Sequence, residues 1–227
     1  MLRTAVAAVG AVTALTCSLA ACAPLRMGAA AIVGDHRISS ATLTNEVANV
    51  QATLAASKGK IPPQVPASEL PQQVLSWLLR FQVREELASQ ARVTVTTAER
   101  QQALAGIAAQ ARQGGAASVS LADLAAANGL PPNLLNELGR YQAIENAVIN
   151  RLDNGTLPTS QLALQALSLR FNHMQCLTAK RLAIRVNPQY GRLDYGQLAI
   201  VAAPPTLSAL PVPARSQSPA PQLRPAC

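Results

Sequence analysis

Apolar side chains recur at helical spacing in the first third of the chain. A stripe at positions i, i+4, i+7 and i+11 runs from Leu43 to Leu54, which is the pattern of one helix face. Ser39 or Ser40 precedes the stripe in an N-cap position, and Gly59 follows it. The pattern therefore predicts an amphipathic helix between these residues.

A second predicted helix, over residues 68–91, has a broader apolar surface. It follows a loop with three prolines between Lys60 and Ala67, and Ser68 stands where an N-cap residue is expected. We expect this helix to have more apolar surface than one neighbouring element needs. Its apolar positions are Val74, Leu75, Leu78, Leu79, Phe81, Val83 and Leu87.

Capping signals mark the next two helices. The run from Thr96 to Glu99 has the form of a capping box and predicts a helix that continues to about Arg112. Ser120 repeats the pattern with Asp123, and Asn128-Gly129 ends the short helix that follows, because glycine accepts the left-handed cap conformation.

Prolines introduce the last two helices of the pattern. Pro131-Pro132 precede a stripe formed by Leu134, Leu138, Tyr141, Val148 and Leu152. After a turn at residues 153–156, Pro158 is expected to open a helix that continues to about Ala179.

Short strands are predicted at both ends of this helical region. The run from Ala29 to Ser39 has β-branched residues on both sides of Gly34-Asp35, which favours a hairpin turn. Residues 182–186 alternate between apolar and polar, and we expect them to pair with residues 31–33. The predicted fold is mainly α, with five to six helices closed by a small two- or three-stranded sheet from the two ends of the domain.

The first residues of the chain have the composition of an export leader. Arg3 supplies a positive charge, and the apolar run from Thr4 to Leu15 is shorter than the ~20 residues that a membrane-spanning helix needs. Leu19 to Cys22 looks like a lipobox. In bacterial lipoproteins of this pattern, the resemblance implies cleavage between Ala21 and Cys22 and transfer of a lipid to the Cys22 thiol. The alternative is an ordinary secretory signal whose end contains a cysteine.

These features divide the chain into four parts. Residues 1–21 are expected to be the signal peptide, 22–28 a lipidated linker, 29–200 the helical domain and 201–227 a disordered tail rich in proline. The expected location is the extracytoplasmic face of the cell membrane, with the lipid as anchor.

Charge and aromatic content narrow the possible partners. The formal net charge is +8, the basic residues are scattered singly, and aromatic residues make up 3% of the chain. A nucleic-acid partner is therefore not expected. A basic protein at a membrane favours anionic headgroups or an acidic wall polymer, and the sequence does not decide between them.

Candidate chemistry is sparse. His36 and His173 are the only histidines, so no metal site and no cofactor are expected. Glu85 and Glu86 are neighbours on a helix and point in different directions, which does not suit a general acid and base. Cys176 and Cys227 either form a disulfide in an oxidising compartment or stay separate thiols. The sequence predicts no catalytic residues and no enzyme.

Three short motifs occur in order along the predicted domain. They are Ala31–Ser39, with its strand and turn; Val95–Glu99, of the form V-T-x-x-E; and Val186–Gly191, which reads VNPQYG. With the order of the helices, they resemble the N-terminal chaperone domain of SurA-type peptidyl-prolyl isomerases, and the last motif resembles lipoprotein members from high-GC Gram-positive bacteria. The resemblance covers roughly residues 29–200.

The chain departs from that family in one respect. SurA-type isomerases insert a parvulin domain of about a hundred residues before the closing helix, whereas the stretch between Leu152 and Leu157 leaves no room for one. The resemblance thus implies an ATP-independent chaperone or holdase for unfolded or nascent exported polypeptides, without isomerase activity. The expected client-binding residues are Trp77, Phe81 and Tyr141. The alternative is a docking lipoprotein that binds one dedicated cell-envelope partner.

Overall fold

The structure is a computed structural model of the chain, and it describes residues 28–114, 119–155, 158–202 and 227. The described part contains six α-helices and two small antiparallel sheets, which confirms the predicted fold class. The helices are α1 Ser40–Ala56, α2 Leu70–Ala91, α3 Thr97–Gln113, α4 Leu121–Ala127, α5 Leu135–Leu152 and α6 Gln161–Arg181. A short 3-10 helix, η1 Pro132–Leu134, leads into α5, and a second, η2 Pro188–Tyr190, follows the third strand.

The first sheet joins the two ends of the domain. Its strands are β1 Ala29–Val33, β2 His36–Ser39 and β3 Arg185–Val186, with β1 in the centre. Ala31 pairs with Val186 and Ile32 with Arg185, which confirms the predicted pairing. Only the last two of the predicted residues 182–186 form a strand, because Leu182 caps α6 and Ala183 has a φ of 46°.

Most of the predicted helix starts are confirmed. The Ser39 side chain accepts a hydrogen bond from the Thr42 amide at the start of α1, and Thr96 and Glu99 form both halves of the capping box at α3. The Ser120 side chain accepts a hydrogen bond from the Asp123 amide at the start of α4. Each of these caps depends on residues within one turn of each other, so the local sequence was sufficient to predict them.

Two predicted helix starts are wrong. Ser68 does not cap α2, since the Glu69 amide donates to the Pro66 carbonyl in a backbone turn and the helix begins at Leu70. Pro158 does not open α6, which begins at Gln161, where the Ser160 hydroxyl accepts from the Ala163 amide. A turn over residues 67–69 precedes α2, whereas residues 158 and 159 before α6 lie in no helix, strand or turn.

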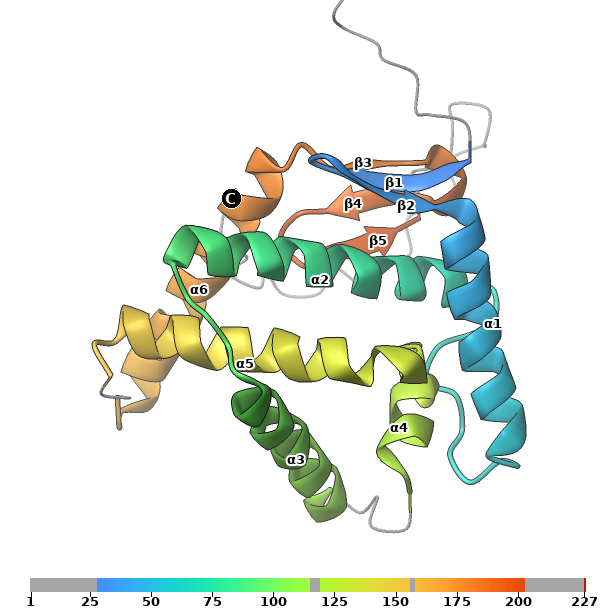
Figure 1. Ribbon diagram of the computed structural model, residues 1–227, viewed down its shortest axis with the longest axis horizontal. Helices are drawn as coiled ribbons and strands as arrows, with labels where there is room; N and C mark the ends of the chain where they lie inside the picture. Colours follow the sequence, from blue (N-terminus) through green and yellow to red (C-terminus); the bar gives the residue numbers. More distant parts are fainter. Residues whose placement is uncertain (1–27, 115–118, 156–157, 203–226) are drawn as a thin grey trace, which may run out of the picture.

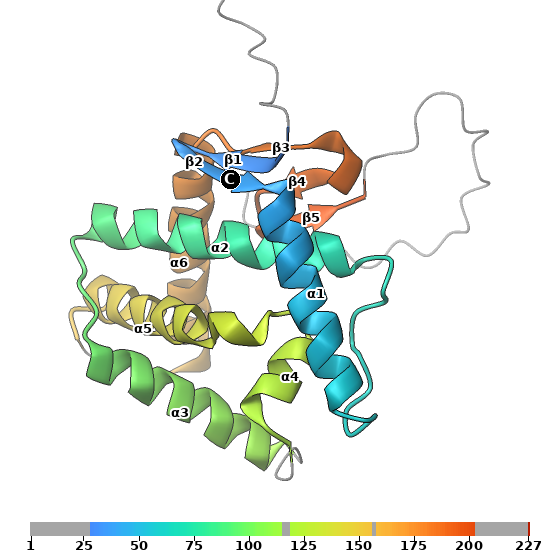
Figure 2. The same ribbon diagram turned by 45° about the vertical axis from the view of Figure 1, so that its right-hand side comes forward.

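Helix α2 runs through the middle of the molecule, between the strands and α5 (Figure 1). Leu75 and Leu79 pack with the first sheet, Phe81 packs with α4, and Leu87 packs with α5 and α6. The broad apolar surface predicted for this helix is thus largely covered by several neighbours. Figure 2 shows α3 on the far side of α5 from α2, with α4 between α3 and α1.

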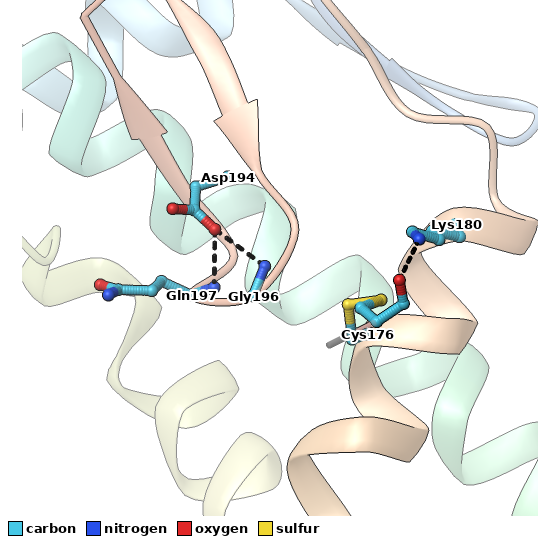
Figure 3. The surroundings of a disulfide bond; sticks show 6 residues. Cys176, Lys180, Asp194, Gly196 and Gln197 are labelled. Atoms are coloured by element: carbon cyan, nitrogen blue, oxygen red, sulfur yellow. Dashed lines mark hydrogen bonds between the residues drawn. A yellow bond between two sulfur atoms is a disulfide. The ribbon is translucent and has the colours of Figure 1, made fainter. Parts of the chain in front are cut away.

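A second hairpin, which the sequence analysis did not predict, lies against α2. It is formed by β4 Arg192–Asp194 and β5 Ala199–Val201, so Val201 belongs to the domain rather than to the expected tail. The Asp194 carboxylate accepts hydrogen bonds from the Gly196 and Gln197 amides in the turn (Figure 3). The buried Ser76 hydroxyl of α2 accepts from the Ile200 amide at 2.8 Å and thereby fixes β5 to the helix.

The last residue of the chain is bonded to α6. Cys227 forms a disulfide with Cys176, with the two Cα atoms 5.8 Å apart, and the Lys180 ammonium donates to the Cys227 carbonyl (Figure 3). Of the two alternatives for these cysteines, the structure has the paired form. The remainder of the expected tail, residues 203–226, lies outside the described residues.

Candidate functional site

The three aromatic residues singled out from the sequence meet in one cluster. The Trp77 and Phe81 rings of α2 lie 6.0 Å apart between centroids, and Tyr141 of α5 lies 6.3 Å from Trp77 and 5.9 Å from Phe81. The two contacts of Tyr141 have an edge-to-face geometry, which aromatic pairs favour. The cluster joins the middle of α2 to the first half of α5.

The members of this cluster differ in exposure. Phe81 is 7% exposed and packs against Leu130 and Ala125, so it supports the cluster from within the core. Trp77 and Tyr141 are half-buried and reach the surface. Trp77 and Tyr141 therefore form the accessible part of the cluster, and Phe81 lies beneath them.

Two arginines of α2 flank the aromatic cluster. The Arg80 guanidinium lies 5.0 Å from the centre of the Trp77 ring and donates to the Leu198 carbonyl at 3.0 Å, which connects the second hairpin to the indole. Burial lowers the pKa of Arg80. Of the smaller electrostatic effects, that of Tyr141 raises this pKa and that of Arg84 lowers it. The Trp77 indole nitrogen is buried without a hydrogen-bond partner among the described residues, so ring contacts hold it in place.

Arg84 is the largest fully buried side chain of the described residues, with 2% exposure. Its guanidinium lies 3.9 Å from the centre of the Tyr141 ring and 4.7 Å from that of Phe171, and it donates to Glu145 at 3.1 Å. This arrangement joins α2, α5 and α6 at the end of the cluster away from Trp77. Arg84 is therefore a structural residue of the core.

An apolar pocket of about 200 Å³ opens beside Trp77, between α2, α3, α4 and the start of α5. Among the described residues that line it, Asn128 is the one polar residue. Such a pocket gains its binding energy from the burial of an apolar side chain and does not select a charge. The other lining residues are Trp77, Ile107, Leu121, Leu124, Ala125, Leu130 and Leu138.

A second apolar surface lies on the first half of α6. Leu162 is 78% exposed, Leu169 is 47% exposed and Leu164 is 38% exposed. Leu162 and Leu169 are seven residues apart, so they lie on the same face of the helix. This surface is separate from the pocket beside Trp77, because α6 contributes no residue to the pocket.

The titratable residues considered in the sequence analysis do not form a catalytic arrangement. His36 and His173 are both exposed, on β2 and α6 respectively. Glu85 binds Arg140 through both carboxylate oxygens, and this hydrogen bonding raises the pKa of Arg140. Glu86 instead accepts from Gln90 at 2.8 Å. The two adjacent glutamates therefore have separate partners.

The described residues contain neither a cluster of metal ligands nor a helix that could span a membrane. No group of three or more His, Cys, Asp or Glu side chains in this part of the chain is placed to hold a metal ion. Within the same residues, none of the helices combines the length and the apolar character required to span a bilayer. Ala21 and Cys22, the predicted cleavage and lipidation residues, lie outside the described ranges.

No family model, curated protein or solved structure was found to match this chain. Sequence reasoning identified Trp77 but missed its pocket neighbours Ile107, Leu121 and Leu124. These leucines and the isoleucine follow the helical spacing of α3 and α4, yet the spacing alone does not say which helices enclose a pocket.

Proposed function

We propose that this protein is a membrane-anchored, extracytoplasmic lipoprotein that acts as an ATP-independent chaperone or holdase for exported polypeptides. The observation that carries the proposal is the apolar pocket beside Trp77, with Tyr141 and the supporting Phe81 next to it. The described lining of this pocket brings one amide and no acid or base to the cavity, and such a lining suits an apolar side chain that a folded protein hides. The resemblance to SurA-type chaperone domains supports the same function.

The energetics of the pocket suit reversible holding. Burial of one Leu, Phe or Met side chain contributes about 1.5–3 kcal/mol, which is roughly a ten- to hundredfold gain in affinity. One such contact binds an unfolded segment weakly and without sequence specificity. The client can then dissociate without energy from ATP, and a chain that has buried its own apolar residues no longer binds.

The lipid anchor would place the pocket close to the membrane. The linker between Cys22 and Ala29 has six residues, Ala23 to Gly28, and these extend to no more than ~20 Å at ~3.3–3.6 Å per residue. A domain held by this linker would act at the membrane surface, where secreted chains emerge. Stable attachment requires two or more acyl chains, because a single chain binds a bilayer reversibly.

The proposal does not include prolyl isomerase activity. Helix α5 ends at Leu152 and α6 begins at Gln161, so the connection between them runs from Asp153 to Ser160. SurA-type isomerases have their parvulin domain at this place, and the connection is far too short to contain one. This chain would share only the client-binding domain of the SurA-type proteins.

A second candidate function is docking to one dedicated envelope partner. The exposed Leu162 and Leu169 on one face of α6 favour it, because a pair of apolar residues seven positions apart suits a helix of a defined partner. Light scattering separates the two functions. A chaperone suppresses the aggregation of two unrelated denatured proteins at near-stoichiometric ratio, whereas a docking protein leaves both aggregation curves unchanged and retains one partner in a pull-down from envelope extract.

A further inference from the structure

A second cavity lies between α3 and α5. The two helices approach closely at Gly139, where an added Cβ would lie 2.7 Å from Leu104 Cγ and 2.9 Å from the Arg100 carbonyl oxygen. Beyond this contact a groove of about 590 Å³ runs between one stripe of α3 and one stripe of α5. Its lining from Glu99 to Gln110 extends over about 16 Å of the α3 axis at ~1.5 Å per residue.

The lining of this groove has a distinctive composition. Its small residues are Ala103 and Gly106 on α3 and Ala143 and Ala147 on α5, which leave room between the helices. Five side-chain amides surround them: Gln102, Gln110, Gln142, Asn146 and Asn150. Each amide offers a carbonyl acceptor and two N–H donors, so the groove can serve ligands that present donors and acceptors together.

The groove has little charge. Among the described residues that line it, Glu99 is the only ionisable one, and its carboxylate accepts hydrogen bonds from the Thr96 amide and hydroxyl, both at 2.7 Å. Phosphate and other anions call for arginine or lysine, and the described part of this lining contains neither. A neutral ligand with alternating donors and acceptors fits it best, and an extended polypeptide backbone has this pattern at every residue.

The groove is adjacent to the apolar pocket. Ile107 of α3 lines both, so a chain lying in the groove reaches the pocket beside Trp77 without leaving the surface. Among the described residues no aromatic one lines the groove, whereas Trp77 lines the pocket together with leucines that include Leu121 and Leu124. The groove can therefore form hydrogen bonds with a peptide backbone, and the adjacent pocket can bury an apolar side chain.

We propose that the α3–α5 groove binds the backbone of an extended client segment while the Trp77 pocket takes one of its apolar side chains. At ~3.3 Å per residue, the 16 Å of groove accommodates about five residues. Hydrogen bonds to the peptide backbone do not depend on the sequence of the bound chain. The two cavities together therefore select extended chains that carry an exposed apolar residue. This inference rests on the proposed chaperone function and specifies how a client is held.

A glycine in the groove offers a blocking variant that keeps the fold. A Cβ at Gly106 would meet no atom of the described residues within 4 Å, and Gly106 is an exposed position in the middle of α3. Gly106→Leu therefore fills the groove, and it also favours the helix, because glycine is a poor helix former. Ala105→Leu is the matched control, since Ala105 is exposed on the same helix and lines neither cavity.

The probe is a fluorescein-labelled peptide of about seven residues, with a central leucine among alternating alanine and serine, and binding is measured by fluorescence anisotropy. The protein is the chain from Ala23 onward, which contains every residue that the structure describes. We expect Gly106→Leu to weaken binding at least tenfold and Ala105→Leu to leave it unchanged. N-methylation of alternate peptide amides removes backbone donors and is expected to weaken binding by about tenfold.

The outcomes distinguish the groove from the chaperone function. If Gly106→Leu and N-methylation leave peptide binding unchanged while Trp77→Ala weakens it, the groove proposal is overturned and the chaperone function stands. If the wild type suppresses no aggregation but binds the peptide in a manner that Gly106→Leu blocks, the groove proposal is supported and the chaperone function fails. Binding of a neutral oligosaccharide that Gly106→Leu blocks, with no binding of the peptide, would assign the groove to a glycan and overturn the proposal.

Discussion

The Arg84 guanidinium and the Glu145 carboxylate lie 3.1 Å apart in an ion pair of unequal burial, with side-chain exposures of 2% and 29%. The guanidinium also lies 3.9 Å from the centre of the Tyr141 ring and 4.7 Å from that of the Phe171 ring. A charge in such a place is stabilised by its carboxylate partner and by the faces of the rings. Since Arg84 of α2 contacts residues of both α5 and α6, the pair helps to hold these three helices together beneath the aromatic cluster.

The unequal burial predicts unequal effects of removing each partner. Glu145→Gln leaves the buried Arg84 charge without a counterion, and we expect a loss of about 3–5 kcal/mol in the free energy of unfolding. Arg84→Met removes the buried charge and leaves a carboxylate with access to water, so the loss is expected to be smaller. Urea unfolding followed by circular dichroism measures both; an equal or larger loss for Arg84→Met would contradict this account.

The capping box at α3 predicts a dependence of stability on pH. Hydrogen bonds from the Thr96 amide and then from its hydroxyl lower the pKa of Glu99 in the folded protein. The folded pKa is thus below the unfolded value of about 4.3, so the stabilisation is fully present above that pH and is lost as the pH falls through the folded pKa.

Thr96→Ala tests this prediction. It removes the hydroxyl that donates to the Glu99 carboxylate and accepts from the Glu99 amide, and it leaves the hydrogen bond from the amide of residue 96. We expect a loss of about 1 kcal/mol near neutral pH, together with a smaller fall in stability between about pH 5 and pH 3 than in the wild type. Thr97→Ala is a useful control, since Thr97 is exposed on the first turn of the same helix and does not cap it. An identical acid response in Thr96→Ala and wild type would contradict the assignment.

The disulfide between Cys176 and Cys227 predicts a simple thiol count. In the chain from Ala23 onward these are the only cysteines, so the denatured, unreduced protein should show no free thiol, and the reduced protein should show two. Cys176→Ser is expected to lower the free energy of unfolding by about 2–4 kcal/mol, because the bond closes a long loop. Two free thiols before reduction would contradict the pairing.

The lipobox interpretation predicts the fate of a Cys22 variant. Cys22→Ala removes the thiol that would receive the lipid, so the chain should remain uncut or be released from the membrane. Membrane fractionation with mass spectrometry of the amino terminus measures this. Cys17→Ala is the control, because Thr16 stands before this second leader cysteine where a lipobox has a small residue, and this variant should be processed normally. A Cys22→Ala protein that is cut before residue 22 and still membrane-bound would count against a lipid anchor.

Local signals in the sequence were enough for much of the fold. The caps at Ser39, Thr96 and Ser120 depend on residues three positions apart, so they were visible in the sequence and are present in the structure. The second hairpin was missed, although Asp194 and Gly196 form a recognisable turn signal between apolar residues. Its strands have three residues each, too few for a clear alternation.

The candidate site was less accessible to sequence reasoning. Trp77, Phe81 and Tyr141 were expected to act together, and they do meet in one cluster. The burial of Phe81 was not predictable, because it depends on the position of α4, which packs Ala125 against the ring. The pocket and the groove likewise depend on which helices lie side by side, and helical spacing does not contain that information.

The central claim is that the pocket beside Trp77 binds unfolded chains, and light scattering with variants on two surfaces tests it most directly. Two unrelated denatured proteins are mixed with the wild type, with Trp77→Ala and with Leu162→Ser, after circular dichroism has shown that each variant is folded. The account predicts that the wild type and Leu162→Ser suppress aggregation of both proteins and that Trp77→Ala suppresses it at least several-fold less. Equal suppression by folded Trp77→Ala and wild type would contradict the account, as would no suppression by the folded wild type.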